Sequence, residues 1–278
     1  MIRIVIDSSS DYTAEEAASK NLTFIPIRIT MGDNSYRDGV DFKKDEFFEM
    51  LPKTVEFPKT SQPSPQEFLT VFKEAKEKGD SVICILLSSG LSGTCQSAVL
   101  ARNMVEYDNI YIVDSLGAAC MIRFLIEHAR TLVSRGHSAA EIADILNDLK
   151  KRVRLMAVLD TLEYLSKGGR VPKALATIGE IAKIKPVITI TEDGEVGVLG
   201  KCIGKNKAAS HLIDDFSKFT VDTDFPFYTI YSYGTGNCEN FEAKLLGSGQ
   251  AITDRLQIGA TIGAHIGHNA YGIVFVSK

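Results

Sequence analysis

Two short clusters of hydroxyl residues have the composition and spacing of an anion-binding site. The first is KTSQPSPQEFL, which starts at residue 59, and the second is LSSGLSGT, which starts at residue 87. Each cluster stands just ahead of a predicted helix, whose first turn has free N–H groups and a partial positive charge. Hydroxyl groups beside such a helix start add hydrogen-bond donors for a small anion. The residues that we expect to hold the anion are Thr60, Ser61, Ser92, Gly93 and Thr94.

Helix capping is the simpler interpretation of the same residues. Ser64 and Glu67 have the spacing of a capping box, which accounts for Ser64 without any ligand. Any single serine or threonine here is explained equally well as a cap. The two clusters together favour an anion site, because Gly90 and Gly93 would let the backbone approach a ligand closely.

Two more specific sequence motifs do not match the second cluster. A phosphate-binding loop needs G-x-x-x-x-G-K-[ST], and no lysine follows Gly93. A nucleophile elbow needs G-x-S-x-G, whereas Gly93 follows Ser92 directly, one residue too early. Since neither motif is present, we assign no catalytic residue.

The first half of the chain alternates strand-like runs with helical patterns. SVICILL, at residues 81–87, is a continuous apolar run of the kind found in parallel strands covered on both faces. The alternation predicts a doubly wound α/β fold with a mostly parallel sheet, which binds ligands at the carboxyl ends of its strands. The expected strands are 2–7, 22–30, 81–87 and 109–115, and the expected helices are 13–20, 43–51, 65–79, 93–107, 117–135 and 139–152.

The second half predicts an α+β fold with a mixed sheet. KPVITITEDGEVGVLGK, which starts at residue 185, alternates around Asp193-Gly194, a strong hairpin signal. We place a boundary so that residues 1–153 form an N-terminal domain and residues 154–278 a C-terminal domain. The other expected strands are 154–160, 226–234 and 271–277, and the expected helices are 161–169, 172–183, 205–218 and 238–248.

Composition and charge limit the kinds of partner and the cellular location that we expect for this chain. The chain has 278 residues and a formal net charge of −4, which argues against general nucleic-acid binding. The start, MIRIVIDSSSDY, has too short an apolar run for a secretory signal, and no run is long enough to span a bilayer. Five cysteines without a CxxC pair suggest reduced thiols. We therefore expect a cytoplasmic protein with no metal and at most transient membrane contact.

The chain resembles the DegV family of bacterial fatty-acid-binding proteins, including the FakB subunits of fatty acid kinase. The matching stretches are ordered along essentially the whole chain, and their combination is specific. They are DSSSDY at 7–12, TSQPSP at 60–65, SSGLSGTCQSA at 88–98, VDS at 113–115, LDTLEYLSKGGRV at 159–171 and IGAHIG at 262–267.

This resemblance implies a two-domain DegV-like fold that holds one long-chain fatty acid between its domains. It implies no cofactor and no catalysis by the chain itself. FakB members present the acyl carboxyl group to a separate ATP-dependent fatty acid kinase subunit, which makes acyl phosphate for phospholipid synthesis. The family's carboxylate contacts fall on Thr60 and Ser92, and its histidine near the C-terminus matches His265.

Several further residues have two readings. Arg170 matches a position near the mouth of the site, where we expect a structural ion pair or a partner contact. Lys201 and Lys205 belong to a basic run that is either a solvated face or a kinase-docking surface. The family commonly reads H-x-G-P-G-A after its histidine, whereas His268 and Asn269 stand here. Candidates for the tail slot, each also explained as simple core, are Met121, Ile122, Leu125 and the residues around Ile178.

Two other functions remain open on the residues alone. The first is an acyl hydrolase or acyltransferase that uses Ser92 with His265. The second is an α/β module that binds a nucleotide or a sugar phosphate. Asp7 and Asp114 end predicted strands where some α/β proteins bind Mg²⁺, but no phosphate-binding lysine accompanies them.

Overall fold

The structure is a computed structural model that describes residues 1–171, 184–247 and 249–278. The helix expected over 172–183, with Ile178, lies outside the described residues. Among the described residues, no helix combines the length and the apolar character that crossing a membrane requires.

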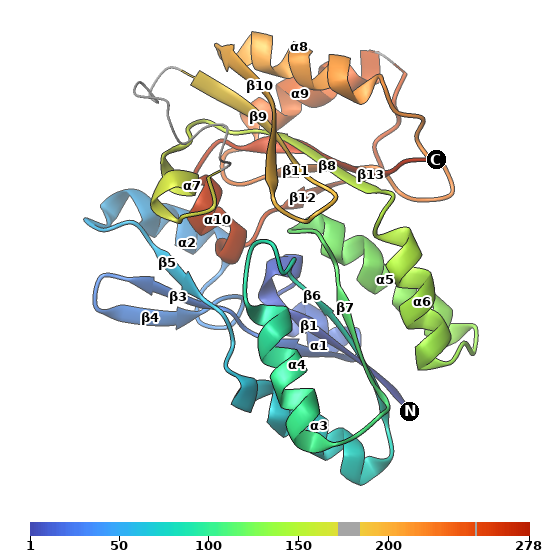
Figure 1. Cartoon of the computed structure of the whole chain (residues 1–278). Coiled ribbons are helices and arrows are strands. Elements are labelled where there is room, and N and C mark those ends of the chain that lie inside the picture. Colours follow the sequence, from blue (N-terminus) through green and yellow to red (C-terminus); the bar gives the residue numbers. More distant parts are fainter. Residues whose placement is uncertain (172–183, 248) are drawn as a thin grey trace.

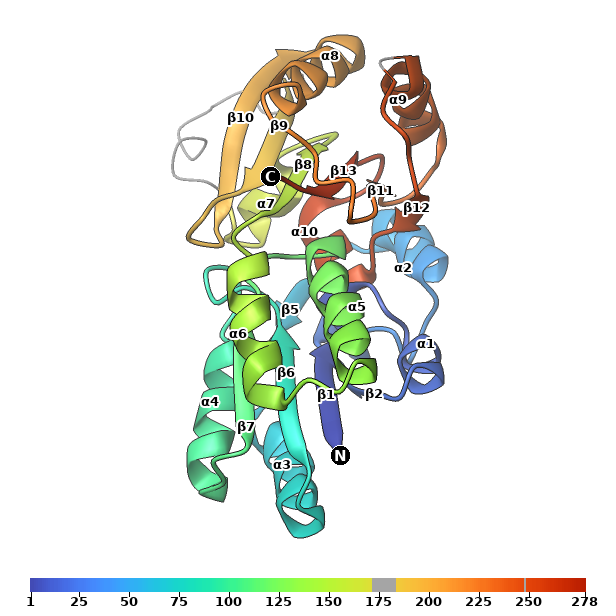
Figure 2. The ribbon, with the colours of Figure 1, turned by 90° about the vertical axis from the view of Figure 1, so that its right-hand side faces the viewer.

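Four parallel strands form the sheet of the first half, in the order β2-β1-β6-β7. Helices α3 and α4 cover one face and α5 and α6 cover the other (Figure 2). The predicted doubly wound fold is therefore confirmed. The elements are β1 (Ile2–Asp7), η1 (Ser8–Ser10), α1 (Ala14–Ser19), β2 (Leu22–Ile25), α3 (Pro65–Lys78), β6 (Ser81–Leu86), α4 (Thr94–Val105), β7 (Ile110–Asp114), α5 (Cys120–Ser134) and α6 (Ala139–Leu149).

Side chains of this sheet alternate between two apolar layers. Ile4 and Ile6 pack with α5 and α6, whereas Val5 between them packs with α3 and α4. The central strand β6 is buried almost throughout, as expected of a strand covered by helices on both faces. Local signals set the helix starts: the Glu67 carboxylate accepts hydrogen bonds from the backbone N–H and the hydroxyl of Ser64.

Residues 22–30 do not form the single strand that the sequence predicts. They divide into β2 and β3 (Arg28–Met31), and β3 belongs to a separate antiparallel sheet of order β4-β3-β5. Pro26, which has no N–H to donate to a strand ladder, lies between the two strands. The other members are β4 (Asn34–Arg37) and β5 (Lys59–Ser61), and α2 (Lys44–Met50) and η2 (Leu51–Lys53) lie between them in sequence.

The second half contains a mixed sheet, as predicted, and this sheet has six strands. Its order is β10-β9-β8-β13-β11-β12, and only the β11–β12 pair is parallel among its described strands. Helices α8 and α9 cover the face that points away from the first half (Figure 1). The elements are β8 (Val153–Val158), α7 (Glu163–Lys167), β9 (Ile184–Ile190), β10 (Val196–Ile203), α8 (Lys205–Phe216), β11 (Tyr228–Tyr231), α9 (Gly236–Gly247), β12 (Asp254–Gln257), α10 (Ala260–Ile266) and β13 (Tyr271–Val276).

We propose that the chain divides into two domains near residue 153, where the six-stranded sheet begins. Helix α10 is the main exception to this simple division. It belongs to the second half in sequence but packs on α2, β3 and β5 of the first half, as well as on α7.

Two buried carboxylates hold the start of α10 against the first half. Asp11 Oδ1 accepts the N–H of Gly259 at 2.7 Å, and Asp38 Oδ2 accepts the N–H and the hydroxyl of Thr261 at 2.9 and 2.6 Å. Burial raises the pKa of both carboxyl groups, and that of Asp11 reaches about 7. These bonds satisfy free N–H groups at the helix start and fix the orientation of α10.

We expect Gly272→Ala to lower the free energy of unfolding by about 2 kcal/mol, the usual cost of forcing an extra group into a packed interior. Gly272 lies on β13 beside β8, and an added Cβ would stand 2.2 Å from the carbonyl oxygen of Met156. Urea denaturation measures the loss. Gly236→Ala is the control, since its Cβ would meet nothing within 4 Å. Equal stability of the two variants would contradict this reading of the strand contact.

Candidate functional site

A cavity of about 260 Å³ lies between the six-stranded sheet and the first half of the chain. Its wall comes from segments far apart in sequence, including β5, β8, β9 and α10. Most of the lining is aliphatic, and the polar side chains belong to a small group. That group is Thr60, Ser61, Gln62, Ser92, Arg170, Thr261 and His265.

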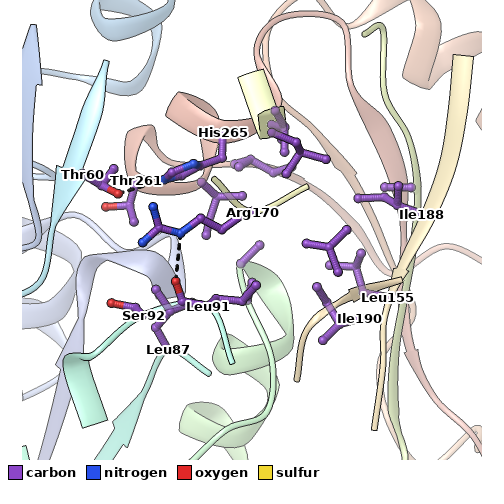
Figure 3. A pocket seen from close by; sticks show the side chains of 18 of the residues that line it. Thr60, Leu87, Leu91, Ser92, Leu155, Arg170, Ile188, Ile190, Thr261 and His265 are labelled. Atoms are coloured by element: carbon purple, nitrogen blue, oxygen red, sulfur yellow. Dashed lines mark hydrogen bonds between the residues drawn. The ribbon is translucent and has the colours of Figure 1, made fainter. Parts of the chain in front are cut away.

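The polar side chains gather at one end of the cavity. Figure 3 shows Thr60, Ser92, Arg170 and His265 on one side of the space and apolar residues of β8 and β9 on the other. Thr60 comes from β5, not from the helix start that the sequence predicts, and only Ser64 of that cluster begins α3. The structure therefore brings together hydroxyl, imidazole and guanidinium groups at a single end.

His265 is a neutral member of this group. Its Nε2 shares a hydrogen bond of 2.8 Å with Thr60 Oγ1, while the buried Nδ1 has no partner among the described residues. Burial lowers the pKa of His265 to about 4, with a further contribution from the positive charge of Arg170. The imidazole is therefore uncharged near neutral pH, and it can either donate or accept one hydrogen bond at Nε2.

Arg170 brings a fixed positive charge to the same end. Its Nε donates to the carbonyl of Leu91 at 3.1 Å, and Nη1 donates to the carbonyl of Gly168 at 2.6 Å. The structural ion pair that the sequence suggests is not found among the described residues, because both bonds go to backbone carbonyls. The charge of Arg170 is thus held in place and left available to an anion.

The second hydroxyl cluster reaches the pocket through one side chain. Ser92 lines it, and Ser92 Oγ lies 2.9 Å from Thr94 Oγ1, which is buried. Gly93 and Thr94 are not among the lining residues. An added Cβ on Gly93 would stand 2.0 Å from Gln62 Oε1, so this glycine makes room for a side chain and not, as expected, for a ligand.

Two polar lining residues were not predicted from the sequence. Gln62 directly follows Ser61 in the first cluster, so its position in TSQPS was the available signal. Thr261 lies four residues before His265, and both project from the same face of α10. The four-residue spacing of Thr261 and His265 is informative only if the glycine-containing segment around them is known to be helical.

One apolar wall of the cavity is a face of the six-stranded sheet, and aliphatic residues of the first half, such as Leu87 and Ala118, also line the cavity. Leu155 and Ala157 of β8 point into the cavity together with Ile188 and Ile190 of β9. Their neighbours, such as Met156, point to the opposite face, since strand side chains alternate. The predicted candidates Met121, Ile122 and Leu125 of α5 are core residues that do not line the cavity.

Other singled-out residues lie elsewhere. Lys201 on β10 and Lys205 at the start of α8 are not among the lining residues, and their role in docking a partner stays a prediction. His268 Nε2 lies 2.7 Å from the carbonyl oxygen of Phe48, which ties the unusual loop after α10 to α2. The Asp7 carboxylate accepts the backbone N–H groups of Ser9 and Leu87, a structural role.

Comparisons with known proteins agree over the full length. The family model described as uncharacterised proteins of the DegV family matches residues 1–278. A DegV domain-containing protein of Caldanaerobacter subterraneus is 36% identical over 280 residues, covering 100% of this chain and 99% of that protein. A fatty-acid-binding DegV family structure from Thermus thermophilus has a TM-score of 0.87 at 29% identity, covering 100% of this chain and 99% of that one. DegV of Bacillus subtilis, a fatty acid binding protein, has a TM-score of 0.82 at 30% identity, with coverage of 100% and 99%.

Proposed function

The chain belongs to the DegV family, and from this premise we propose that it binds one long-chain fatty acid in its interior cavity. The carboxylate lies at the end formed by Thr60, Ser92, Arg170 and His265, and the tail lies along the aliphatic wall. The observation that carries the proposal is the segregation of the cavity into one polar end and one long apolar wall. Fatty acid binding by the similar structures from Thermus thermophilus and Bacillus subtilis supports it.

The two ends of the cavity contribute differently to binding. Burial of about fifteen methylenes at about 0.8 kcal/mol each gives ~12 kcal/mol before the cost of ordering the ligand. Hydrogen bonds to a carboxylate contribute about 1.5–3 kcal/mol each. The tail therefore sets most of the affinity, and the polar end sets which way the ligand points.

We propose that the chain is a non-catalytic carrier that presents the carboxyl group to a separate ATP-dependent fatty acid kinase subunit in the cytoplasm. Exposure at the polar end supports this role: Ser61 and Gln62 line the cavity and are also exposed to solvent. A carboxylate held there lies close to the surface, where a partner enzyme can reach it. Contact with a membrane is at most transient in this scheme.

The acyl hydrolase alternative requires Ser92 to be activated by His265. Instead, the hydroxyl of Ser92 pairs with Thr94, and Nε2 of His265 pairs with Thr60. The described residues thus hold the two groups in separate hydrogen bonds. This arrangement favours binding of a carboxylate over attack on an ester.

Mass spectrometry of the untreated protein tests the proposal. The purified chain is extracted with organic solvent for analysis of the extract, and the intact chain is measured under native conditions. We expect one fatty acid per chain. The proposal is wrong if the purified protein carries no fatty acid and also fails to bind added oleate or palmitate. A rise in melting temperature with ATP or sugar phosphates, but not with fatty acids, would support the phosphate-ligand alternative.

Removal of the hydroxyl groups of Thr60 and Ser92 is expected to reduce presentation of the fatty acid to the kinase more than it reduces the stability of the fold. The double variant Thr60→Ala/Ser92→Ala loses two donors to the carboxylate, so acyl phosphate formation with the kinase supplied should fall by at least about tenfold. The melting temperature should fall only by a few degrees, because folding loses the hydrogen bonds from Thr60 to His265 and from Ser92 to Thr94, each of which contributes about 1 kcal/mol. Thr70→Ala/Ser134→Ala is the matched control, since those hydroxyls bond exposed helix carbonyls. Wild-type activity in the first variant would show that the anchor is assigned wrongly.

A further inference from the structure

The β9–β10 hairpin docks on the loop after β6, beside the cavity. The hydroxyl of Ser88 donates to the carbonyl of Gly194 at 2.7 Å in a buried contact. An added Cβ on Gly194 would stand 2.0 Å from Ser88 Oγ, and one on Gly90 would stand 2.9 Å from the carbonyl oxygen of Asp193. The turn therefore lies directly on the loop after β6, and Gly90 admits this hairpin where the sequence suggested a ligand.

The strand register orders the apolar wall toward that turn. Ala157 of β8 pairs with Ile188 of β9, and the next inward-facing positions are Leu155 and Ile190. Ile190 in turn pairs with Val196 of β10, just beyond the hairpin turn. Leu155, Ile190 and Val196 thus form one row across three strands, which we call the end row.

The end row lies opposite the polar end. Strand β8 runs from Leu155 toward α7, and the Gly168 that follows α7 lies against the imidazole of His265. Figure 3 shows Leu155 and Ile190 across the space from Thr60, Ser92 and His265. A ligand with its carboxylate at the polar end can therefore extend its tail along β8 and β9 toward this row.

On the basis of the proposed function, we propose that the end row is the stop that selects the length of the bound tail. Ala157 acts with it, because its small side chain leaves the tail room to pass before the stop. Successive inward positions on one strand lie about 6.6 Å apart. A large side chain at Ala157 would move the stop inward by that distance, which an extended chain covers with about five bonds at ~1.2 Å per bond.

The test is a binding profile with decanoic, dodecanoic, tetradecanoic, hexadecanoic, octadecanoic and eicosanoic acids. Ile190→Ala should shift the preferred acid to a longer tail, and Ala157→Leu should shift it to a shorter one. Each methylene group that gains or loses a buried position in the variant should change the affinity for that acid about fourfold relative to the wild type. Leu155→Ala provides a second lengthening variant if Ala157→Leu does not fold.

Ile273→Ala is the control, because Ile273 is a fully buried isoleucine of the same sheet that packs on the α8 and α9 face. It should lower stability and leave the length profile of the wild type unchanged. If folded Ile190→Ala and Leu155→Ala bind fatty acid with the same chain-length preference as the wild type, the end row does not select the length of the tail. Failure of the wild type to bind any acid of the series would instead overturn the proposed function itself.

Discussion

Arg170→Glu is expected to weaken fatty acid binding about 100-fold at low ionic strength, and Arg170→Gln about tenfold. Among the described lining residues, Arg170 supplies the permanent positive charge at the polar end of the cavity. One pair of opposite charges at ~4 Å contributes about 4 kcal/mol near a protein surface, and solvent at this half-buried side chain reduces that figure. Reversal of the charge removes the attraction and adds a repulsion, so its effect should exceed that of neutralisation.

Two further readouts separate a charge effect from a general loss of structure. The penalty for Arg170→Glu should shrink as salt rises, because salt screens the interaction. The pKa of His265 should rise from about 4 in Arg170→Gln, since Arg170 contributes to lowering it, but should stay below its ordinary value because burial is the larger cause. Titration of the His265 ring by nuclear magnetic resonance measures this shift without any ligand.

Arg135→Glu is the charge-reversal control, because Arg135 is exposed at the end of α5 and does not line the cavity. Its affinity should match that of the wild type. Equal affinities of Arg170→Glu and Arg135→Glu would mean that the carboxylate is held elsewhere. The salt series must be run on both proteins, since net charge alone alters binding of an anionic ligand.

The parts of the fold that follow local rules were predictable. The apolar run of β6 indicated a strand covered on both faces, and both faces are covered. The Thr13–Glu16 pair indicated a helix start, and both reciprocal hydrogen bonds are present. These signals need only neighbouring residues, so the sequence contains all the information they require.

Elements that depend on distant partners were missed. Helix α10 contains Gly263, whose added Cβ would stand 2.6 Å from the ring of Phe48, so the glycine allows close packing on α2. Glycine disfavours a helix locally, and here the tertiary contact outweighs that preference. Strand β5 is only three residues long and exists through its pairing with β3.

The candidate site shows the same division. Thr60 and His265 were each singled out, but their hydrogen bond joins β5 to α10, neither of which the sequence predicted. The tail wall was not identified, because Ala157 and Met156 are both apolar and buried although they face opposite sides of the sheet. Which face borders a cavity depends on what packs against it, and no local pattern records that.

Asp11→Asn is expected to stabilise the protein at pH 8 by up to about 4 kcal/mol and to change its stability little near pH 5. Burial raises the pKa of Asp11 from 3.8 to about 7, opposed in part by Lys44 and by the N–H of Gly259. A difference of about three pKa units corresponds to ~4 kcal/mol. Asparagine is neutral at every pH, and it tolerates the left-handed backbone of this position, where φ is 63°.

The sign follows from proton binding. Between about pH 4 and pH 7 the folded protein holds a proton on Asp11 that the unfolded chain has released, so the free energy of unfolding falls as the pH rises. The asparagine variant lacks this loss, and the carbonyl oxygen of its side chain can still accept the N–H of Gly259 at the start of α10. The advantage of the variant should therefore grow across that window and level off above it.

Urea unfolding at pH 5 and pH 8 gives the free energy of unfolding of the wild type and of the variant. The difference between the two proteins removes the contribution of every group that titrates in the same way in both. Asp148→Asn is the control, because the Asp148 side chain is 83% exposed and its partner Lys151 lies on the surface. A pH-independent difference for Asp11→Asn would show that the buried carboxyl does not carry the shifted pKa. A growing difference would establish that the bond from Asp11 to α10, the helix that presents His265 to the cavity, is maintained at a cost in stability at alkaline pH.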